Sequence, residues 1–265
     1  MSGTRIILLG TGSSGGVPRV GGDWGVCDPN EPKNRRRRCC ALVKKERSGG
    51  GVTSILIDTS PDLREQLLDA GVTHLDGVVY THDHADQSHG IDDVRALAIR
   101  QRKAIPVYFD PFTRDSLTER FRYCFEGGKG YPAILSPQTT IDADQIFTIN
   151  GAGGPVEFLP VRMVHGSIAC MGYRIGEVAY CNDVNELPPE TMQQLRGLDV
   201  LIIDALRYTP HPSHAHLELA LSWIADLKPR RTILTNLHVD MDYQTLCKEL
   251  PANVEPGYDG IEIEI

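Results

Sequence analysis

The sequence contains no long apolar stretch and little cysteine. No apolar run approaches the roughly 18 residues of a membrane-spanning helix, and the chain opens Met-Ser-Gly-Thr-Arg, without the charged and then apolar leader of an exported protein. Its seven cysteines are odd in number, irregularly spaced over 265 residues and far below the density of a disulfide scaffold. These absences predict a cytoplasmic protein with no membrane partner.

Positive charge is also scarce. The 27 Lys and Arg residues are outnumbered by 35 Asp and Glu, and the net charge of -8 argues against broad nucleic-acid binding. We therefore expect no stable nucleic-acid partner. The one strong basic run, residues 33–38, is expected to be a solvated face, with a phosphate-binding role as the alternative. The length predicts a single domain, 1–265, and leaves a homodimer open.

A glycine-rich segment follows the first predicted strand, residues 5–9. Residues 10–15 match the G-x-G-x-x-G spelling of a dinucleotide-binding fingerprint, which requires a helix directly afterwards. Gly16, Pro18 and Gly21 follow instead, so we reject a dinucleotide site. A loop whose backbone amides approach a phosphate and a plain tight turn both stay open.

Residues 41–43 and 54–57 read as a hairpin, joined by a flexible connection at 48–51. Asp58 closes the second strand, where it could cap the predicted helix 62–68 or brace a later polar loop. A further loop at 126–132 is expected to be a mobile surface segment near the site.

Residues 81–90, Thr-His-Asp-His-Ala-Asp-Gln-Ser-His-Gly, carry the densest chemistry of the chain. They follow a short apolar strand, and after them apolar residues recur at helical spacing over residues 91–98. His82 and His84, two positions apart, can grip one ion, and Asp86 can add a hard oxygen. An exposed polar loop is the competing interpretation.

Four later apolar strands each end in a polar residue with ligand chemistry. These residues are His165, Asp183, Asp204 and His238. Because the carboxyl ends of neighbouring strands share one rim, we expect them to converge with His82.

Imidazoles mixed with carboxylates suit Zn, Mn, Fe or Ni, and the ligands are too many for one tetrahedral ion. We predict two divalent ions, Zn or Mn, with Ni or Fe as alternatives. The expected ligand sets are His82, His84 and His165 for the first ion, Asp86 and His238 for the second, and Asp183 between the two.

This set of motifs resembles the metallo-β-lactamase superfamily. The resemblance implies an α/β fold of four αββα layers with a dinuclear site on one edge. Residues 12–18, Arg38-Cys39, residues 90–95 and residues 204–207 are similar to the phosphoribosyl 1,2-cyclic phosphate phosphodiesterase branch of carbon-phosphorus lyase pathways. That branch is related to ribonuclease Z.

Two departures from the family pattern affect the metals. Gln87 stands where the superfamily usually has histidine, and its amide oxygen is a weaker ligand than imidazole. The second ion would then bind loosely, have its coordination completed by substrate, or be a harder ion such as Mn. His89 is expected to be structural. The branch also carries extra cysteines for an accessory zinc; here only Cys27 stands in that loop, so we expect no such zinc, and we expect Cys39 and Cys40 to be core thiols.

A departing alkoxide needs a proton. By resemblance, His214 is the general acid and Asp204 orients it, while His216 is expected to cap the next helix and His211 to be exposed. Phosphate-binding candidates are Arg207, for which a surface salt bridge is the alternative, and Arg38, Ser13 and Ser14.

The resulting prediction is an enzyme, a dinuclear phosphodiesterase cleaving a small cyclic phosphate or nucleotide-like phosphodiester. A hydroxide between the ions, aligned by Asp86, would attack phosphorus while His214 protonates the leaving oxygen. The alternatives are a ribonuclease Z-like endonuclease, a lactonase or thioester hydrolase on the same fold, and a metal-binding non-enzyme.

Overall fold

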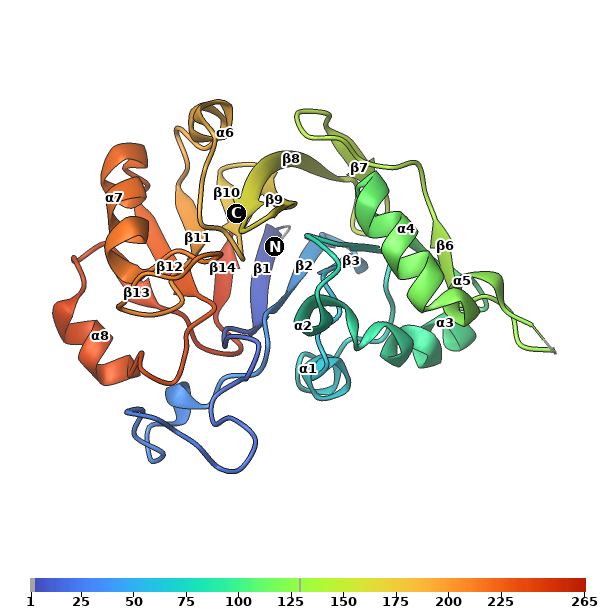
Figure 1. Ribbon diagram of the computed structural model, residues 1–265. Helices are drawn as coiled ribbons and strands as arrows, with labels where there is room; N and C mark the ends of the chain where they lie inside the picture. The colour runs from blue at the N-terminus through green and yellow to red at the C-terminus, as the bar shows by residue number, and fades with distance from the viewer. Residues whose placement is uncertain (1–2, 129) are drawn as a thin grey trace.

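The computed structural model describes residues 3–128 and 130–265, which build two seven-stranded sheets (Figure 1). The first sheet contains β1 (Gly3–Gly10), β2 (Cys40–Arg47), β3 (Gly51–Ile57), β4 (Gly77–Val79), β5 (Ile105–Tyr108), β6 (Leu135–Pro137) and β14 (Glu262–Glu264). The second contains β7 (Phe147–Ile149), β8 (Val156–His165), β9 (Ile168–Ile175), β10 (Val178–Cys181), β11 (Val200–Asp204), β12 (Arg231–Thr235) and β13 (Val254–Pro256).

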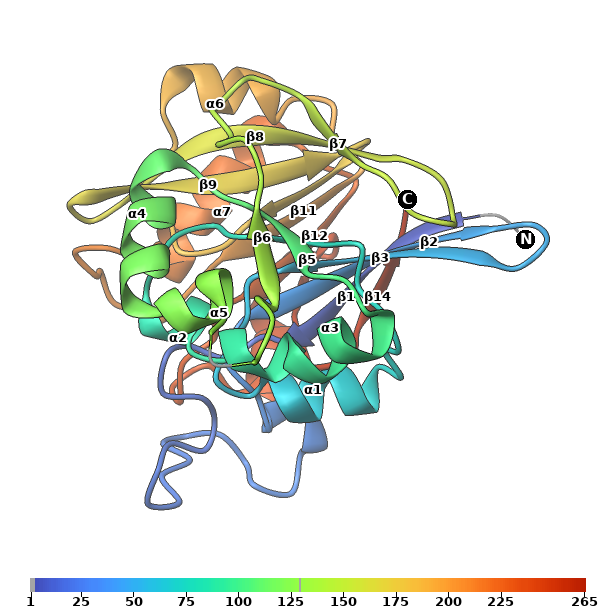
Figure 2. The same ribbon diagram turned by 90° about the vertical axis from the view of Figure 1, so that its right-hand side faces the viewer.

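Helices cover the outer faces of both sheets. They are α1 (Leu63–Asp69), α2 (Ala85–Ser88), α3 (Arg95–Gln101), α4 (Pro111–Arg120), α5 (Arg122–Glu126), α6 (Pro189–Gln194), α7 (Leu217–Leu227) and α8 (Tyr243–Glu249), with 3-10 helices at Pro32–Asn34 and Ile91–Val94. In Figure 1, α7 and α8 lie to the left of the sheets, α3 and α4 to the right, and α1 below them. Figure 2 shows α1, α3, α4 and α5 from the front. Across the described ranges, no helix combines the length and apolar character needed to cross a bilayer.

Strand alternation explains the layers. In β1, Ile6 and Leu8 pack between the sheets, whereas Ile7 and Leu9 pack under the helices of the first sheet. Because successive side chains leave a strand on opposite faces, a strand that is apolar at every position must be covered on both sides. A third apolar cluster joins α7 and α8 to the second sheet. The predicted αββα sandwich is confirmed.

Most locally predicted elements are present. β2 and β3 form the expected antiparallel hairpin, and among the described residues no helix follows the glycine-rich segment before Pro32. The expected helix 91–98 begins instead as the 3-10 turn Ile91–Val94 and continues as α3. In the loop 126–132, Glu126 still belongs to α5 and residue 129 lies outside the described residues.

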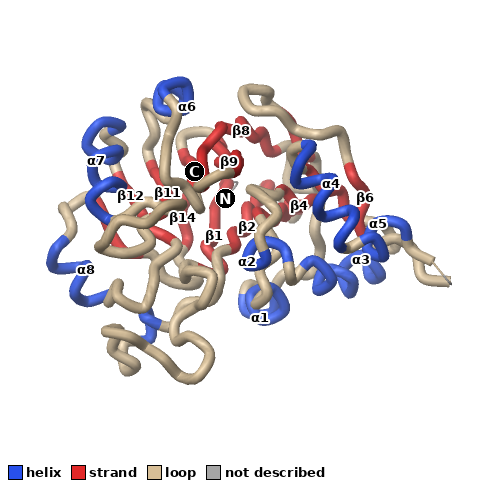
Figure 3. Tube along the Cα trace, viewed as in Figure 1, coloured by secondary structure: helices blue, strands red, loops and turns tan. Residues whose placement is uncertain are grey.

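The solvated interpretation of the basic run 33–38 is wrong for Arg36, Arg37 and Arg38, whereas Arg35 is exposed. Arg36 is only 2% exposed, and its guanidinium donates to Asn34 Oδ1 at 3.3 Å. Arg37 is paired with Asp69 and Asp259, and Arg38 with Asp62. The run lies on the long connection between β1 and β2, drawn in tan at the bottom of Figure 3. Its charges are therefore used to fix that connection to the rest of the fold.

Strand direction brings several strand ends to one edge. β10, β11 and β12 are mutually parallel, and β8 runs the same way because β8 and β10 are each antiparallel to β9. In the first sheet, β3 and β4 are parallel, and the backbone after β4 meets β9 through the Met171 N–H, which donates to the Thr81 carbonyl at 2.9 Å. The polar residues after these strands therefore share one edge.

Gly90 ties the polar segment 81–90 to the turn after β3. Its N–H donates to the Thr59 carbonyl at 2.9 Å, and a Cβ at this position would lie 2.0 Å from the Ser60 carbonyl oxygen. We predict that Gly90→Ala lowers the free energy of unfolding by about 1–3 kcal/mol through this overpacking, measured by chemical denaturation. Gly3→Ala, where a Cβ meets nothing within 4 Å, is the control. Equal stability of the two variants would contradict this steric account.

Candidate metal centre

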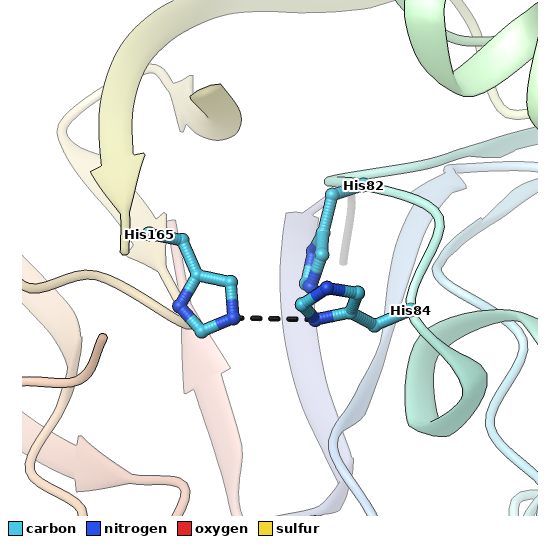
Figure 4. Close-up of side chains that lie close together, drawn as sticks. All are labelled: His82, His84 and His165. Carbon is cyan, nitrogen blue, oxygen red and sulfur yellow. Dashed lines mark hydrogen bonds between the residues drawn. The ribbon is translucent and has the colours of Figure 1, made fainter. Parts of the chain in front are cut away.

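Three histidines form the centre of the shared edge (Figure 4). His82 and His84 come from the segment after β4, and His165 ends β8. Their ring centroids lie 4.6, 5.2 and 5.0 Å apart, and one ligand nitrogen from each lies within 4.8 Å of the others. The structure thus brings together residues separated by more than 80 positions, as the prediction of one shared ion requires.

Asp58 and Thr81 orient the buried ring of His82. Both the N–H and the hydroxyl of Thr81 donate to the Asp58 carboxylate at 2.8 Å, and Thr81 Oγ1 lies 3.0 Å from His82 Nδ1. Because the hydroxyl proton goes to Asp58, its oxygen accepts from Nδ1–H, which leaves Nε2 as the acceptor nitrogen. Of the two roles left open for Asp58, the structure supports the brace.

The three-histidine cluster fits a divalent cation. His82 Nε2 is buried and has no hydrogen-bond partner among the described residues. Burial, together with the neighbouring imidazoles, lowers the pKa of His82 well below its usual value and that of His165 to about 4. These rings are therefore neutral, which is the form that binds metals, and a buried acceptor nitrogen without a donor is satisfied by a cation.

A second cluster lies next to the histidines, at the ends of β10 and β11. His214 Nδ1 lies 2.9 Å from Asp204 Oδ2 and 3.3 Å from Asp183 Oδ1. The His214 and His165 ring centroids are 4.6 Å apart, so the two clusters adjoin. Asp204 therefore holds Nδ1–H of His214, leaving Nε2 on the far side of the ring.

Three of the strand-end residues have left-handed backbone. Asp58, Asp183 and Asn236 have φ values of 66°, 54° and 62°. This conformation is costly for residues with a side chain, although Asp and Asn adopt it more readily than most, and it concentrates at functional sites. Here it turns the chain sharply after β3, β10 and β12.

Asn236 connects the two carboxylates and was missed by sequence reasoning. Its Nδ2 donates to Asp183 Oδ1 at 2.7 Å and to Asp204 Oδ1 at 3.2 Å. The available signal was its position directly after an apolar strand, the same position that Asn182-Asp183 occupies after β10. The sequence pattern predicts a ligand at that strand end only at His238.

Burial raises the pKa of Asp183 well above the usual value, and the nearby Asp86 and Asp204 carboxylates add to this. Burial likewise raises the pKa of Asp58 to about 8. A concentration of buried carboxylates is unfavourable without compensating positive charge. This electrostatic demand is a second reason why the edge suits a cation.

Asp86 and His238 belong to neither compact cluster of the described residues, and their roles as ligands stay predictions. Asp86 is half-buried and accepts from Gln87 Nε2 at 3.2 Å. His238 Nδ1 lies 2.9 Å from Asp240 Oδ1, and its Nε2 lies 3.4 Å from Arg19 Nη1. Arg19 is thus a further cation near the site that sequence reasoning missed.

The phosphate-binding candidates are engaged elsewhere. Arg207 donates to the backbone carbonyls of Thr209 and Pro210, and so shapes the loop leading to His214. Arg38 pairs with Asp62, Ser13 is buried, and Ser14 is exposed. Their assignment to substrate phosphate stays a prediction.

The glycine-rich segment forms a packed turn. The N–H groups of Gly12, Ser13, Gly16 and Val17 all donate to backbone carbonyls of the chain itself. An Ala Cβ at Gly12 would meet Arg36 Cβ at 2.9 Å, which explains the need for glycine there. Of the two alternatives left open, the tight turn is favoured over an amide cradle for phosphate.

Of the other histidines, His216 and His211 have contacts that differ from those expected. His216 occupies the N-cap position of α7, as predicted, but its side chain makes no capping hydrogen bond. His211 is half-buried rather than exposed, and its Nδ1 accepts from the Ser213 N–H at 3.2 Å. His89 lies on the surface with Nε2 3.0 Å from Arg120 Nη2, in keeping with a structural role.

The thiols of Cys39 and Cys40 are buried as predicted.

Comparison with known proteins identifies similar chains over almost the whole length. Residues 53–236 match the beta-lactamase superfamily domain. A solved structure described as a new diphosphatase from the PhnP family is 34% identical, with a TM-score of 0.88, covering 100% of this chain and 98% of that one. The short form of human tRNase Z shares the fold at 16% identity, a TM-score of 0.61 and 98% coverage of each chain.

A curated protein from Porphyromonas gingivalis (strain ATCC BAA-308 / W83), named octanoyltransferase, is 35% identical over 261 residues. The match covers 97% of this chain and 51% of the other protein. The chain therefore spans about half the length of this curated relative.

Replacing Asp58 tests the bracing of the His82 ring. Asn keeps the size and tolerates the left-handed backbone, but its amide cannot accept both Thr81 donors as the carboxylate does. We expect Asp58→Asn to weaken zinc binding about 10- to 100-fold, measured by competition with a chromogenic chelator. Asp76→Asn is the control, because Asp76 accepts the Ser54 N–H at the opposite end of the same strand pair. Unchanged zinc affinity in Asp58→Asn would refute the brace.

Proposed function

Because the chain belongs to the metallo-β-lactamase superfamily and to its PhnP family, we propose that it is a phosphodiesterase acting on a small cyclic phosphate or nucleotide-like phosphodiester. At the coarser level the chain is a metal-dependent hydrolase of this fold. The observation that carries the finer proposal is the position of His214. It is held by Asp204 and lies directly beside the three-histidine cluster.

The proposed ion-binding residues are His82, His84, His165 and Asp183, with Zn or Mn as the ion. Such an ion supplies Lewis acidity: it acidifies water and neutralises charge that develops on phosphate. His82 Nε2 and Asp183 Oδ2 lie 3.7 Å apart, which puts Asp183 at the border of the cluster.

His214 provides the proton for the leaving group. During hydrolysis a bond forms between phosphorus and a water oxygen, and the bond from phosphorus to the departing oxygen breaks. The attacking water releases one proton to solvent as its oxygen bonds to phosphorus. His214, charged beforehand, donates its Nε2 proton to the departing oxygen, while Asp204 retains Nδ1–H and stabilises the charged ring. Asp86 is the proposed group that aligns the attacking water.

The charge of the chain favours a small substrate over RNA. The net charge is -8, and Arg36, Arg37 and Arg38 of the basic run are engaged in buried contacts and ion pairs within the fold. A long RNA needs a continuous positive surface. Likeness to tRNase Z at 16% identity concerns the fold alone.

Octanoyl transfer, named for the Porphyromonas gingivalis protein, is the relevant competing chemistry. This chain matches only half of that protein, and the name does not say which half carries the transfer. With a phosphodiester the Asp204–His214 pair has a defined role, because expelling an alkoxide from phosphorus requires protonation. With an acyl carbonyl substrate the role of this pair is less defined.

The test is hydrolysis by protein reconstituted separately with Zn, Mn and Ni. The substrates are bis-p-nitrophenyl phosphate, a 2′,3′-cyclic nucleotide, a dinucleoside diphosphate and an octanoyl thioester. We expect metal-dependent turnover of the phosphorus substrates, abolished by chelation. Turnover of the thioester alone would refute the proposal.

His214→Ala tests the general acid through leaving-group dependence. p-Nitrophenolate departs readily without a proton, whereas an alkoxide does not. We expect kcat for the cyclic nucleotide to fall about 10²- to 10⁴-fold and kcat for the p-nitrophenyl ester to fall much less. His216→Ala, a histidine of the same segment whose side chain makes no capping bond, should leave both rates nearly unchanged. An equal loss on both substrates would exclude proton donation by His214.

A further inference from the structure

We propose that the chain holds only one ion tightly. Two side chains, Gln87 and Arg19, interact with the groups that would otherwise bind a second ion. The metal count in this inference is independent of the substrate. Only the phosphate-binding role of Arg19 rests on the proposed function.

Gln87 satisfies the carboxylates between the two expected sites. It lies on α2 and is fully buried. Its Nε2 donates to Asp183 Oδ2 at 2.6 Å and to Asp86 Oδ2 at 3.2 Å. These are the carboxylates from which a second ion would take oxygen ligands, and one amide group bridges them.

Asp183 receives amide donors on both oxygens. Asn182 Nδ2 donates to Oδ2 at 3.1 Å, and Asn236 Nδ2 donates to Oδ1 at 2.7 Å. Together with Gln87, three neutral amides surround this buried carboxylate. An ion that binds Asp183 must therefore displace at least one of these hydrogen bonds, which lowers its net affinity. The first ion also has three imidazole ligands, whereas a second ion would depend mainly on the Asp183 and Asp86 carboxylates.

His238 faces a positive charge at the nitrogen that an ion would need. Asp240 engages Nδ1 at 2.9 Å, and Nε2 lies 3.4 Å from Arg19 Nη1. A divalent ion bound at Nε2 would lie next to this guanidinium, and like charges at such separations repel. His82 Nε2 in the first cluster has no comparable donor. The two sites are thus built asymmetrically.

Arg19 is positioned rather than loosely exposed. It forms an ion pair with Asp23, four positions later, and its Nε donates to Asp23 Oδ2 at 2.9 Å. Gly15 leaves room for its stem, since a Cβ there would lie 3.0 Å from Arg19 Cγ. The side chain is 43% exposed, so a ligand can reach the guanidinium. A guanidinium can donate two hydrogen bonds to phosphoryl oxygens and neutralise their charge. A second cation would otherwise supply this positive charge.

Metal stoichiometry tests the asymmetry without any substrate. Protein loaded with excess zinc is dialysed against a moderate chelator, and the retained metal is measured by mass spectrometry, with calorimetric titration giving both affinities. We expect one retained ion per chain in the wild type. Gln87→His should tighten the second site about tenfold or more, since it adds an imidazole ligand and removes the bridging amide. Gln193→His, on the exposed face of α6, is the control for an added surface histidine.

Two equally tight ions in the wild type, or a second-site affinity unchanged in Gln87→His, would overturn the inference.

Replacing Arg19 tests its two roles separately. Arg19→Met should tighten the second site, and it should reduce kcat/KM for a phosphodiester about tenfold at one equivalent of zinc. Arg19→Lys should restore most of this loss. No rescue by lysine would exclude a charge role for Arg19. Absence of any phosphodiester turnover, with one retained ion, would sink the proposed function but leave the metal count standing.

Discussion

The arrangement of the site depends on one constraint: several strands end at the same edge, and the polar groups there are buried. Asp58, His82, Asp183 and Asp204 are almost fully inaccessible to solvent. Each needs a partner, since an unpaired polar group inside a protein is costly. Hydrogen bonds satisfy most of them, while the inward nitrogen of His82 has none among the described residues. A divalent ion is the partner that this geometry accommodates.

The supporting residues determine how rigid the edge is. Left-handed backbone at Asp58, Asp183 and Asn236 turns the chain immediately after three strands, so their short side chains reach one another. The apolar layers on both sides of each sheet hold those strand ends in place. The packing of the sandwich therefore fixes the positions of the site residues, most of which lie at strand ends or in the segments that follow them.

Gln87, the departure from the family pattern, affects which polar groups of the site are hydrogen-bonded within the protein and which are left for an ion. Read along the chain, a glutamine in place of histidine suggests a weak oxygen ligand. In the fold its amide nitrogen is the group in contact, and it joins Asp86 and Asp183. With Arg19 beside His238, the carboxylates and the imidazole on one half of the edge already have protein donors, whereas His82 Nε2 on the other half has none among the described residues.

The sequence by itself determined the His82 and His84 pair, because His-x-His places two ligands together. The four layers were implied by the resemblance that the motifs carry. The sequence also placed ligand types at the ends of later strands. Only the tertiary structure decided that Asn236 joins Asp183 to Asp204, that Arg36 is buried, and that Arg19 reaches His238 across 219 positions. These contacts depend on which loops meet at the edge, and no short-range pattern records the distance between residues that are far apart in the chain.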